Sequence, residues 1–171
     1  MFLEFIIRPI RYEDANDVNE LRRMEGVRDN LYAIPSERVT RAENMIKNLG
    51  KNDHLFVAEV KEKEMLKVVG MVGMSTDDSP RSRHVGSLGI MVRDEYTGKG
   101  IGTALLKEII NLADNYLMIK RLELEVFEEN KGAKKLYERM GFVVEGKKLF
   151  AAVRKGRYAN QYIMARYNDN I

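Results

Sequence analysis

The stretch Val92-Arg-Asp-Glu-Tyr-Thr-Gly-Lys-Gly-Ile-Gly-Thr-Ala-Leu-Leu106 places three alternating glycines between a β-prone segment and an amphipathic one. Gly98, Gly100 and Gly102 allow the backbone to turn tightly and allow an anion to approach the main-chain amides. Apolar residues then recur at helical spacing, so we expect a helix from Ile101 whose free N–H groups and positive dipole end face the same anion. The stretch therefore predicts a diphosphate-binding loop. The alternative is a glycine-rich turn that binds nothing.

The spacing of the glycines excludes two other phosphate-binding motifs. A Walker A loop requires Lys-Ser or Lys-Thr after its last glycine, whereas Lys99 is followed by Gly100. A dinucleotide-binding fingerprint requires two residues between its second and third glycines. The position of that third glycine is occupied by Thr103 or Leu105, depending on which glycine is counted first. Neither nucleotide-binding motif fits the loop.

The rest of the sequence alternates β-prone and amphipathic helical segments. We expect strands at residues 2–8, 55–60, 67–74, 85–92, 122–126, 142–153 and 158–166, and helices at 14–24, 39–49, from 101 onward, and 130–140. Asp14 is a candidate N-cap for the first helix, and Gly50 suits the end of the second. Mixed strands with interposed helices predict an α/β or α+β architecture, with helices packed on a central sheet.

Composition narrows the class of protein. The chain has 171 residues, of which 44% are hydrophobic and 32% charged, as expected for one soluble globular domain spanning residues 1–171. It has no cysteine and only two histidines, so we expect no disulfide, no cysteine nucleophile and no metal site. The net charge of +3 comes from interspersed charges without a basic tract, so we expect no nucleic-acid partner. The N-terminus has no signal peptide and no apolar run approaches about 20 residues, which favours a cytoplasmic protein without a membrane partner.

A second motif lies in Glu129-Asn-Lys-Gly-Ala-Lys-Lys-Leu-Tyr-Glu-Arg-Met-Gly-Phe142. Asn130 is positioned to cap a short helix, and Gly141 suits the residue after its end. Tyr137 falls on the apolar face of that helix, where a hydroxyl needs a hydrogen-bond partner. Taken alone, Asn130 is explained as a plain helix cap and Tyr137 as a core tyrosine.

In combination, the two motifs resemble the GNAT superfamily of N-acetyltransferases, and the resemblance covers most of the chain. The family's usual loop has Arg or Gln, two residues, Gly, one residue, then Gly or Ala. Here Thr97, Gly100 and Gly102 occupy those positions. Thr97 departs from the pattern and weakens any side-chain contact there. The resemblance implies a mostly antiparallel central sheet with one splayed parallel strand pair and flanking helices. It also implies acetyl-CoA as co-substrate and a small-molecule amine as acceptor. Related enzymes are often dimers, so a homodimer is an expectation.

The resemblance also assigns residues to the cofactor. The pantetheine arm would pair with the strand before the loop, and the diphosphate would bind the loop and the start of the helix. Asn130 would contact the cofactor arm, and Tyr137 would lie near the sulfur. The complete set of expected cofactor residues is Ile90, Met91, Val92, Thr97, Gly98, Lys99, Gly100, Ile101, Gly102, Thr103, Asn130, Ala133 and Tyr137.

The implied reaction is direct attack of a neutral amine on a thioester, which needs no covalent enzyme intermediate. A backbone amide near Met91 or Val92 would polarise the carbonyl, and Tyr137 would act as general acid. The general base is undecided among Glu123, Glu125 and His84, each acting through water. Alternatively, the two glutamates belong to a solvated strand face and His84 to a strand end.

Three further stretches, at residues 30–35, 80–85 and 154–166, are similar to a bacterial subgroup that acetylates free L-amino acids. In the fold of this superfamily the segment between the first two helices and the final hairpin wall the acceptor pocket. The expected wall residues are Leu31, Tyr32, Ile34 and Pro35 from the segment, and Phe150 and Tyr158 from the hairpin. An apolar lining favours an apolar amino acid over a polycation. The alternatives are a protein or peptide N-terminal or lysine acetyltransferase, and a non-catalytic CoA-binding sensor.

Overall fold

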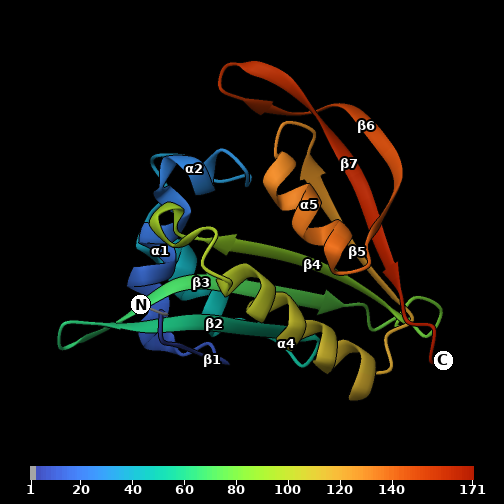
Figure 1. Ribbon diagram of the computed structural model, residues 1–171, viewed down its shortest axis with the longest axis horizontal. Coiled ribbons are helices and arrows are strands. Elements are labelled where there is room, and N and C mark those ends of the chain that lie inside the picture. Colours follow the sequence, from blue (N-terminus) through green and yellow to red (C-terminus); the bar gives the residue numbers. More distant parts are fainter. Residues whose placement is uncertain (1–2) are drawn as a thin grey trace.

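The computed structural model describes residues 3–171, and the strands in this part of the chain form a seven-stranded mixed sheet (Figure 1). The strand order is β1-β2-β3-β4-β5-β7-β6. The strands are β1 (Phe5–Pro9), β2 (Asp53–Glu62), β3 (Met65–Thr76), β4 (Val85–Val92), β5 (Arg121–Phe127), β6 (Val143–Arg154) and β7 (Arg157–Tyr167). The helices are η1 (Tyr12–Asp14), α1 (Ala15–Arg23), α2 (Glu25–Arg28), α3 (Val39–Lys47), η2 (Asp94–Tyr96), α4 (Ile101–Asn115) and α5 (Lys131–Arg139).

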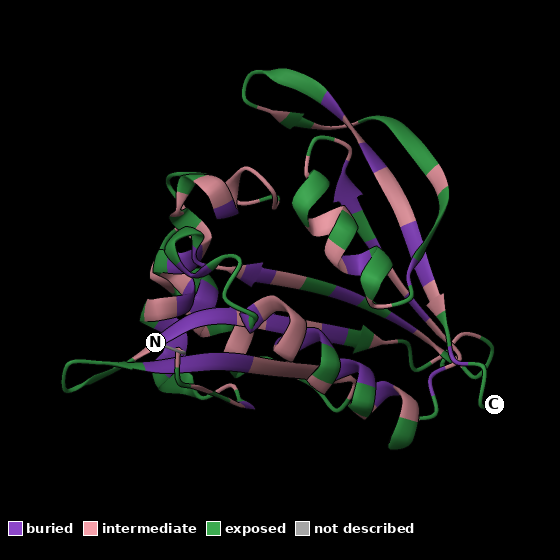
Figure 2. Ribbon diagram, in the orientation of Figure 1, coloured by how far each residue is buried: buried purple, intermediate pink, exposed green. Residues whose placement is uncertain are grey.

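Helices cover both faces of the sheet, and each face has its own apolar core (Figure 2). On one face α4 packs its buried stripe, including Leu105 and Ile109, against Val72 of β3 and Leu122 of β5. On the other face the residues of α1 and α3 meet Met91 of β4. That second cluster contains Ala15, Val18, Leu21, Val27, Ala42 and Met91. Because neighbouring strand residues point to opposite faces, β4 contributes to both cores.

The strands β4 and β5 form the one parallel pair of the sheet described here, and their pairing is short. Only three rungs join them: Val85 with Arg121, Gly86 with Leu122, and Ser87 with Glu123. Beyond these rungs the two strands diverge, so that the sheet opens like a V toward the carboxyl ends of β4 and β5 (Figure 1). The expected mixed sheet with a splayed parallel pair is confirmed.

The expected elements are present, with differences at particular ends. The first strand is Phe5–Pro9, and the part of the expected strand at residue 2 lies outside the described residues. Asp14 occupies the N-cap position of α1 without capping it, because its carboxylate accepts hydrogen bonds from the Arg8 guanidinium and the Arg11 amide. The short α2 was not expected. Within residues 3–171 no helix is long and apolar enough to cross a bilayer.

Arg93 fixes the start of the glycine loop. It directly follows β4 and is only 1% exposed. Its Nε donates to the carbonyl of Val68 in β3 at 2.9 Å, and its Nη1 and Nη2 donate to the Glu20 carboxylate of α1 at 2.7 and 3.1 Å. One guanidinium therefore ties β3, α1 and the end of β4 together. Its hydrogen bond lowers the pKa of Glu20.

Replacing Arg93 by methionine is expected to lower the free energy of unfolding by about 1–3 kcal/mol, because the buried Val68 carbonyl loses its donor. Urea denaturation at pH 7 measures this, with the exposed Arg83→Met as control, expected to change stability by less than about 0.5 kcal/mol. Because Arg93 lowers the pKa of Glu20, the ion-pair part of the difference is present at neutral pH. It is lost as the pH falls through the lowered pKa of Glu20. Equal stability of Arg93→Met and the native protein would contradict this role.

Candidate active site

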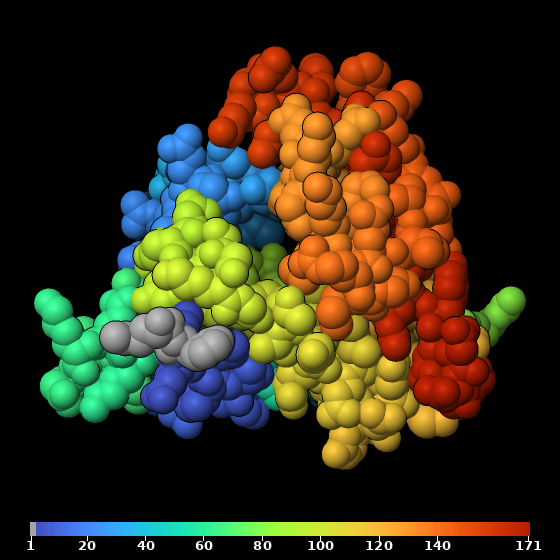
Figure 3. Space-filling view, in the orientation of Figure 1, coloured from blue at the N-terminus to red at the C-terminus, as the bar shows by residue number. Residues whose placement is uncertain are grey.

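A cavity of about 630 Å³ occupies the opening between β4 and β5. It appears in the space-filling view as a hollow between the N-terminal helices, the glycine loop and α5 (Figure 3). Its walls come from α2 and the segment after it, from β4, from the glycine loop and the start of α4, from β5, and from α5. The cavity therefore joins the two faces of the sheet, since α2 lies on one face and α4 and α5 on the other. Its volume is in the ordinary range for a small-molecule site.

The glycine loop turns its backbone toward this cavity. Gly98 and Gly100 have φ angles of +73° and +86°, which side chains other than hydrogen rarely tolerate. A Cβ on either residue would meet no atom within 4 Å, so the space beside them is open. Gly102 is different, because a Cβ there would come within 3.1 Å of Leu136 of α5. The first two glycines thus expose the main chain, and the third permits close helix packing.

The N-terminus of α4 points at the same space. Gly100 is its N-cap, and no side chain of the described residues caps it. The first N–H groups of a helix have no acceptor within the helix, and its dipole makes this end positive. The exposed backbone and the helix end together form a cradle that fits a diphosphate.

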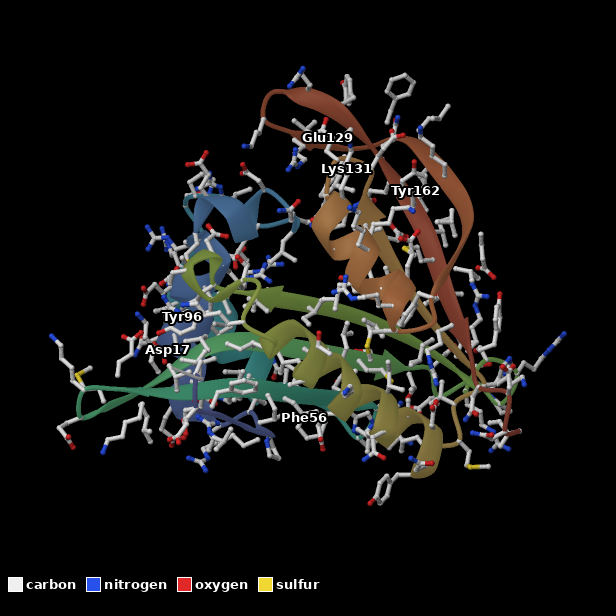
Figure 4. All side chains as sticks on the ribbon, viewed as in Figure 1. Asp17, Phe56, Tyr96, Glu129, Lys131 and Tyr162 are labelled. Carbon is white, nitrogen blue, oxygen red and sulfur yellow. The ribbon has the colours of Figure 1, made fainter. Side chains whose placement is uncertain are left out.

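Not every expected loop residue faces the cavity. Thr97 lines it, but its hydroxyl donates to the carbonyl of Asp94 at 2.7 Å and stabilises the turn. The Lys99 ammonium lies over the ring of Tyr96, 4.9 Å from its centroid, and outside the lining (Figure 4 labels Tyr96). The side chain of Ile101 is 1% exposed and belongs to the core, so only its backbone is available to a ligand.

The β4 backbone provides the wall opposite α5. Gly89, Ile90, Met91 and Val92 all line the cavity. The amide of Arg93 donates to the carbonyl of Val69 in β3. Because strand N–H groups alternate between the two edges, the amide of Met91 also faces β3, and those of Ile90 and Val92 face the opening. Of the two amides expected to polarise a carbonyl, Val92 is therefore the one with suitable orientation.

Tyr137 lines the cavity from α5 and is 6% exposed. Its ring packs edge-on against Phe142, with centroids 5.9 Å apart. Within residues 3–171 its hydroxyl has no hydrogen-bond partner, and it is not among the fully buried unpartnered atoms, which fits a hydroxyl that borders the open cavity. Burial raises the pKa of Tyr137, so the hydroxyl is protonated at neutral pH.

The start of α5 supports the cofactor side of the cavity. Asn130 caps the helix by accepting a hydrogen bond from the Ala133 amide at 3.1 Å. Both residues also line the cavity, so the cap does not exclude a ligand contact through the Asn130 amide nitrogen. Leu136 and Arg139 line it as well and were not expected. They follow Ala133 by three and six residues, and this helical spacing is the sequence pattern that could have predicted them.

The three candidate bases lie in different places. His84 precedes β4 at the closed end of the opening, roughly 26 Å along the strand from Val92 at about 3.3 Å per residue. Glu123 is level with the last rung, where Ser87 and Arg121 donate to its carboxylate at 3.3 and 3.0 Å. Neither lines the cavity. Glu125, two residues further along the same face of β5, does.

The expected acceptor walls are only partly formed. Leu31 lines the cavity, together with Gly26, Val27 and Asn30, which sequence reasoning did not single out. Ile34 and Pro35 are exposed and lie outside it. Tyr32 is 65% exposed, and its hydroxyl donates to Gln161 of β7. Phe150 and Tyr158 stack edge-on against each other on the outside of the hairpin and are 72% and 74% exposed. Neither ring lines the cavity, and the pairing of β6 with β7 is irregular between Lys148 and Ala152, where Phe150 has a φ of +51°.

The tip of the β6–β7 hairpin is attached to the segment after α2. Arg154 donates to the carbonyl of Asp29 at 2.8 Å and to the Asn30 side chain at 3.4 Å. It also pairs with Glu129, which lies beside the hairpin in Figure 4, and stacks on the ring of Phe127. These contacts attach the hairpin tip to the segment after α2, which lines the cavity through Asn30 and Leu31.

Comparison with known proteins places this geometry in a family. The model for the acetyltransferase (GNAT) family matches residues 18–142. The L-amino acid N-acetyltransferase AaaT of Escherichia coli (strain K12) is 28% identical over 95% of this chain and 98% of its own. The spermidine N(1)-acetyltransferase of the same organism is 26% identical over 90% and 81%. A crystal structure of a GNAT-family acetyltransferase from Streptococcus pneumoniae has a TM-score of 0.82 and 26% identity, covering 96% and 99% of the two chains. The chain therefore belongs to the GNAT family of acetyl-CoA-dependent N-acetyltransferases.

Proposed function

We propose that the protein transfers the acetyl group of acetyl-CoA to the α-amine of a free L-amino acid with an apolar side chain. The observation that carries this is the cavity between β4 and β5, which joins a diphosphate cradle on one face of the sheet to Val27 and Leu31 on the other. A donor and an acceptor entering from opposite faces would meet within it. The amino acid N-acetyltransferase that covers 95% of this chain supports the choice of acceptor.

The donor side fits acetyl-CoA, whose thioester supplies the acetyl group. The amides of the glycine loop and the first turn of α4 would hold the diphosphate. The outward amides of Ile90 and Val92 would pair with the pantetheine arm, and the side-chain nitrogen of Asn130 is available to the same arm. Thr97 would contribute its backbone alone, since its hydroxyl is already bonded to Asp94.

Different residues around the opening would carry out the two proton transfers of the reaction. Glu125 would accept a proton from the incoming ammonium group, directly or through water, and leave the neutral amine that attacks. The Val92 amide would stabilise the negative charge that develops on the carbonyl oxygen. Tyr137 would donate its proton to the departing sulfur, because its hydroxyl is protonated, borders the cavity and makes no hydrogen bond among the described residues.

The first prediction of this proposal concerns Gly100. Gly100→Val is expected to abolish the rise in melting temperature that acetyl-CoA gives the native protein, because a side chain at φ +86° would occupy the cradle. Gly50→Ala, at an exposed glycine without positive φ, serves as control and should keep the full rise. Circular dichroism confirms that the Gly100 variant is folded. A full rise in that folded variant would move the site elsewhere.

The second prediction concerns Tyr137. Tyr137→Phe keeps the ring against Phe142 and removes only the hydroxyl, so folding should be preserved. Turnover is expected to fall by on the order of 10²–10⁴ if the hydroxyl is the proton donor. Steady-state kinetics with a saturating acceptor measure this. A change of less than about threefold would show that Tyr137 serves packing alone.

The third prediction concerns the acceptor. Release of free CoA thiol should be fastest with phenylalanine or methionine, slower with spermidine and an aminoglycoside, and slow with a short peptide bearing a free N-terminus. Turnover of the peptide alone would identify a peptide or protein acetyltransferase. Preference for the polycations would favour the activity of the spermidine N(1)-acetyltransferases that also match this chain. A protein that binds acetyl-CoA and acetylates none of these amines would be a sensor.

A further inference from the structure

A free amino acid carries a positive α-ammonium group and a negative α-carboxylate. The residues proposed to bind acetyl-CoA are not assigned to either group. The ammonium group must reach the base, while the carboxylate remains charged and needs a cation or N–H donors. An amine without a carboxylate, such as spermidine, makes no such demand. A cation near Glu125, on the acceptor face of the sheet, would provide such a partner.

Lys148 meets this requirement. It lies on β6 opposite Gln161 of β7, and Gln161 lies opposite Phe127 of β5. Cross-strand partners share a face, as do residues two apart on one strand, so Lys148, Phe127 and Glu125 lie on the same face. Tyr32 contacts that face through Gln161 and the ring of Phe127. Lys148 is thus on the side of the sheet where the segment after α2 borders the cavity.

The ammonium group of Lys148 is bonded to the carboxylate of Glu125, the residue that lines the cavity. The two side chains are 47% and 38% exposed, so the pair is hydrated and weakly held. The hydrogen bond that Lys148 donates to Glu125 raises the pKa of Lys148, which keeps its ammonium group charged throughout the neutral range. Because the pair is exposed, the two opposite charges of a zwitterionic ligand can bind beside it at a small cost in free energy.

Arg154 is another cation near the acceptor side, and its donors already have partners. Its donors are directed at the Asp29 carbonyl, the Glu129 carboxylate and the Asn30 side chain, and its plane stacks on Phe127. Lys148 has Glu125 as its hydrogen-bond partner in the described part of the chain and keeps further donors available.

We propose that the Glu125–Lys148 ion pair recognises a zwitterionic acceptor, with Lys148 binding the α-carboxylate while Glu125 binds the α-ammonium group. This inference rests on the proposed amino-acid acetylation. It makes Lys148 a specificity-determining residue: its positive charge favours an amine that carries a carboxylate and disfavours a second ammonium group at the same place.

The test compares phenylalanine with phenylalanine amide, which keeps the amine and the ring but lacks the carboxylate. The native protein should prefer phenylalanine in kcat/KM. Lys148→Met should lower kcat/KM for phenylalanine by on the order of 10–100-fold, mainly by raising KM. The same variant should change kcat/KM for phenylalanine amide by less than about threefold. Lys148→Arg keeps the charge and should retain most of the preference.

Lys147→Met is the matched control. Lys147 is the neighbouring residue on β6, points to the opposite face, and pairs with Glu128, which does not line the cavity. The kcat/KM values of Lys147→Met should stay within about twofold of those of the native protein for both acceptors. Equal losses for phenylalanine and its amide in Lys148→Met, or no native preference between them, would overturn the inference while leaving amino-acid acetylation intact. Failure of the native protein to acetylate either acceptor would overturn both proposals.

Discussion

Three rungs of parallel pairing hold β4 beside β5, and beyond Ser87 and Glu123 the two strands part. Inside a sheet, unpaired main-chain groups are costly unless another partner satisfies them. Here the outward amides of Ile90 and Val92 border a cavity, where a ligand with its own amides and carbonyls can replace the missing strand. The opening is therefore the place where the pairing of the sheet is interrupted, and it is where we propose that acetyl-CoA binds.

The elements around the opening depend on how the two strands are held apart. On the β4 side, Arg93 links the end of the strand to β3 and α1 immediately before the chain enters the glycine loop. On the β5 side, β7 continues the sheet along the whole strand, from Arg121 to Phe127. Each strand thus has one firmly paired edge and one open edge. Both strands are thus held in the sheet on the side away from the opening.

The local features of the site could be predicted from the sequence, and the relations between distant segments could not. Three glycines before a helix indicate an anion cradle because φ freedom and the helix N-terminus are properties of neighbouring residues. The choice between Glu123 and Glu125 is different, since both lie on one face of β5 at a spacing of two. What separates them is where the pairing with β4 ends, and that is set by contacts between strands more than thirty residues apart. Phe150 and Tyr158 show the same limit, because the irregular pairing of β6 beside them could not be read from the sequence, and both rings are exposed outside the cavity.

The pairing of charged residues could likewise not be predicted from the sequence. Interspersed lysines and glutamates leave a net charge of only +3 and no tract to interpret. In the fold, the glutamates of β5 and the turn after it lie beside cations of the final hairpin: Glu125 with Lys148, Glu128 with Lys147, and Glu129 with Arg154. Of these carboxylates only Glu125 lines the cavity, and it does so as one member of an ion pair rather than as part of a uniformly acidic wall. A uniformly acidic wall would attract any polycation over long range, whereas alternating charges cancel beyond a few ångströms and act only on a ligand already in place. Selection of the acceptor must then come from short-range matching of charge and shape.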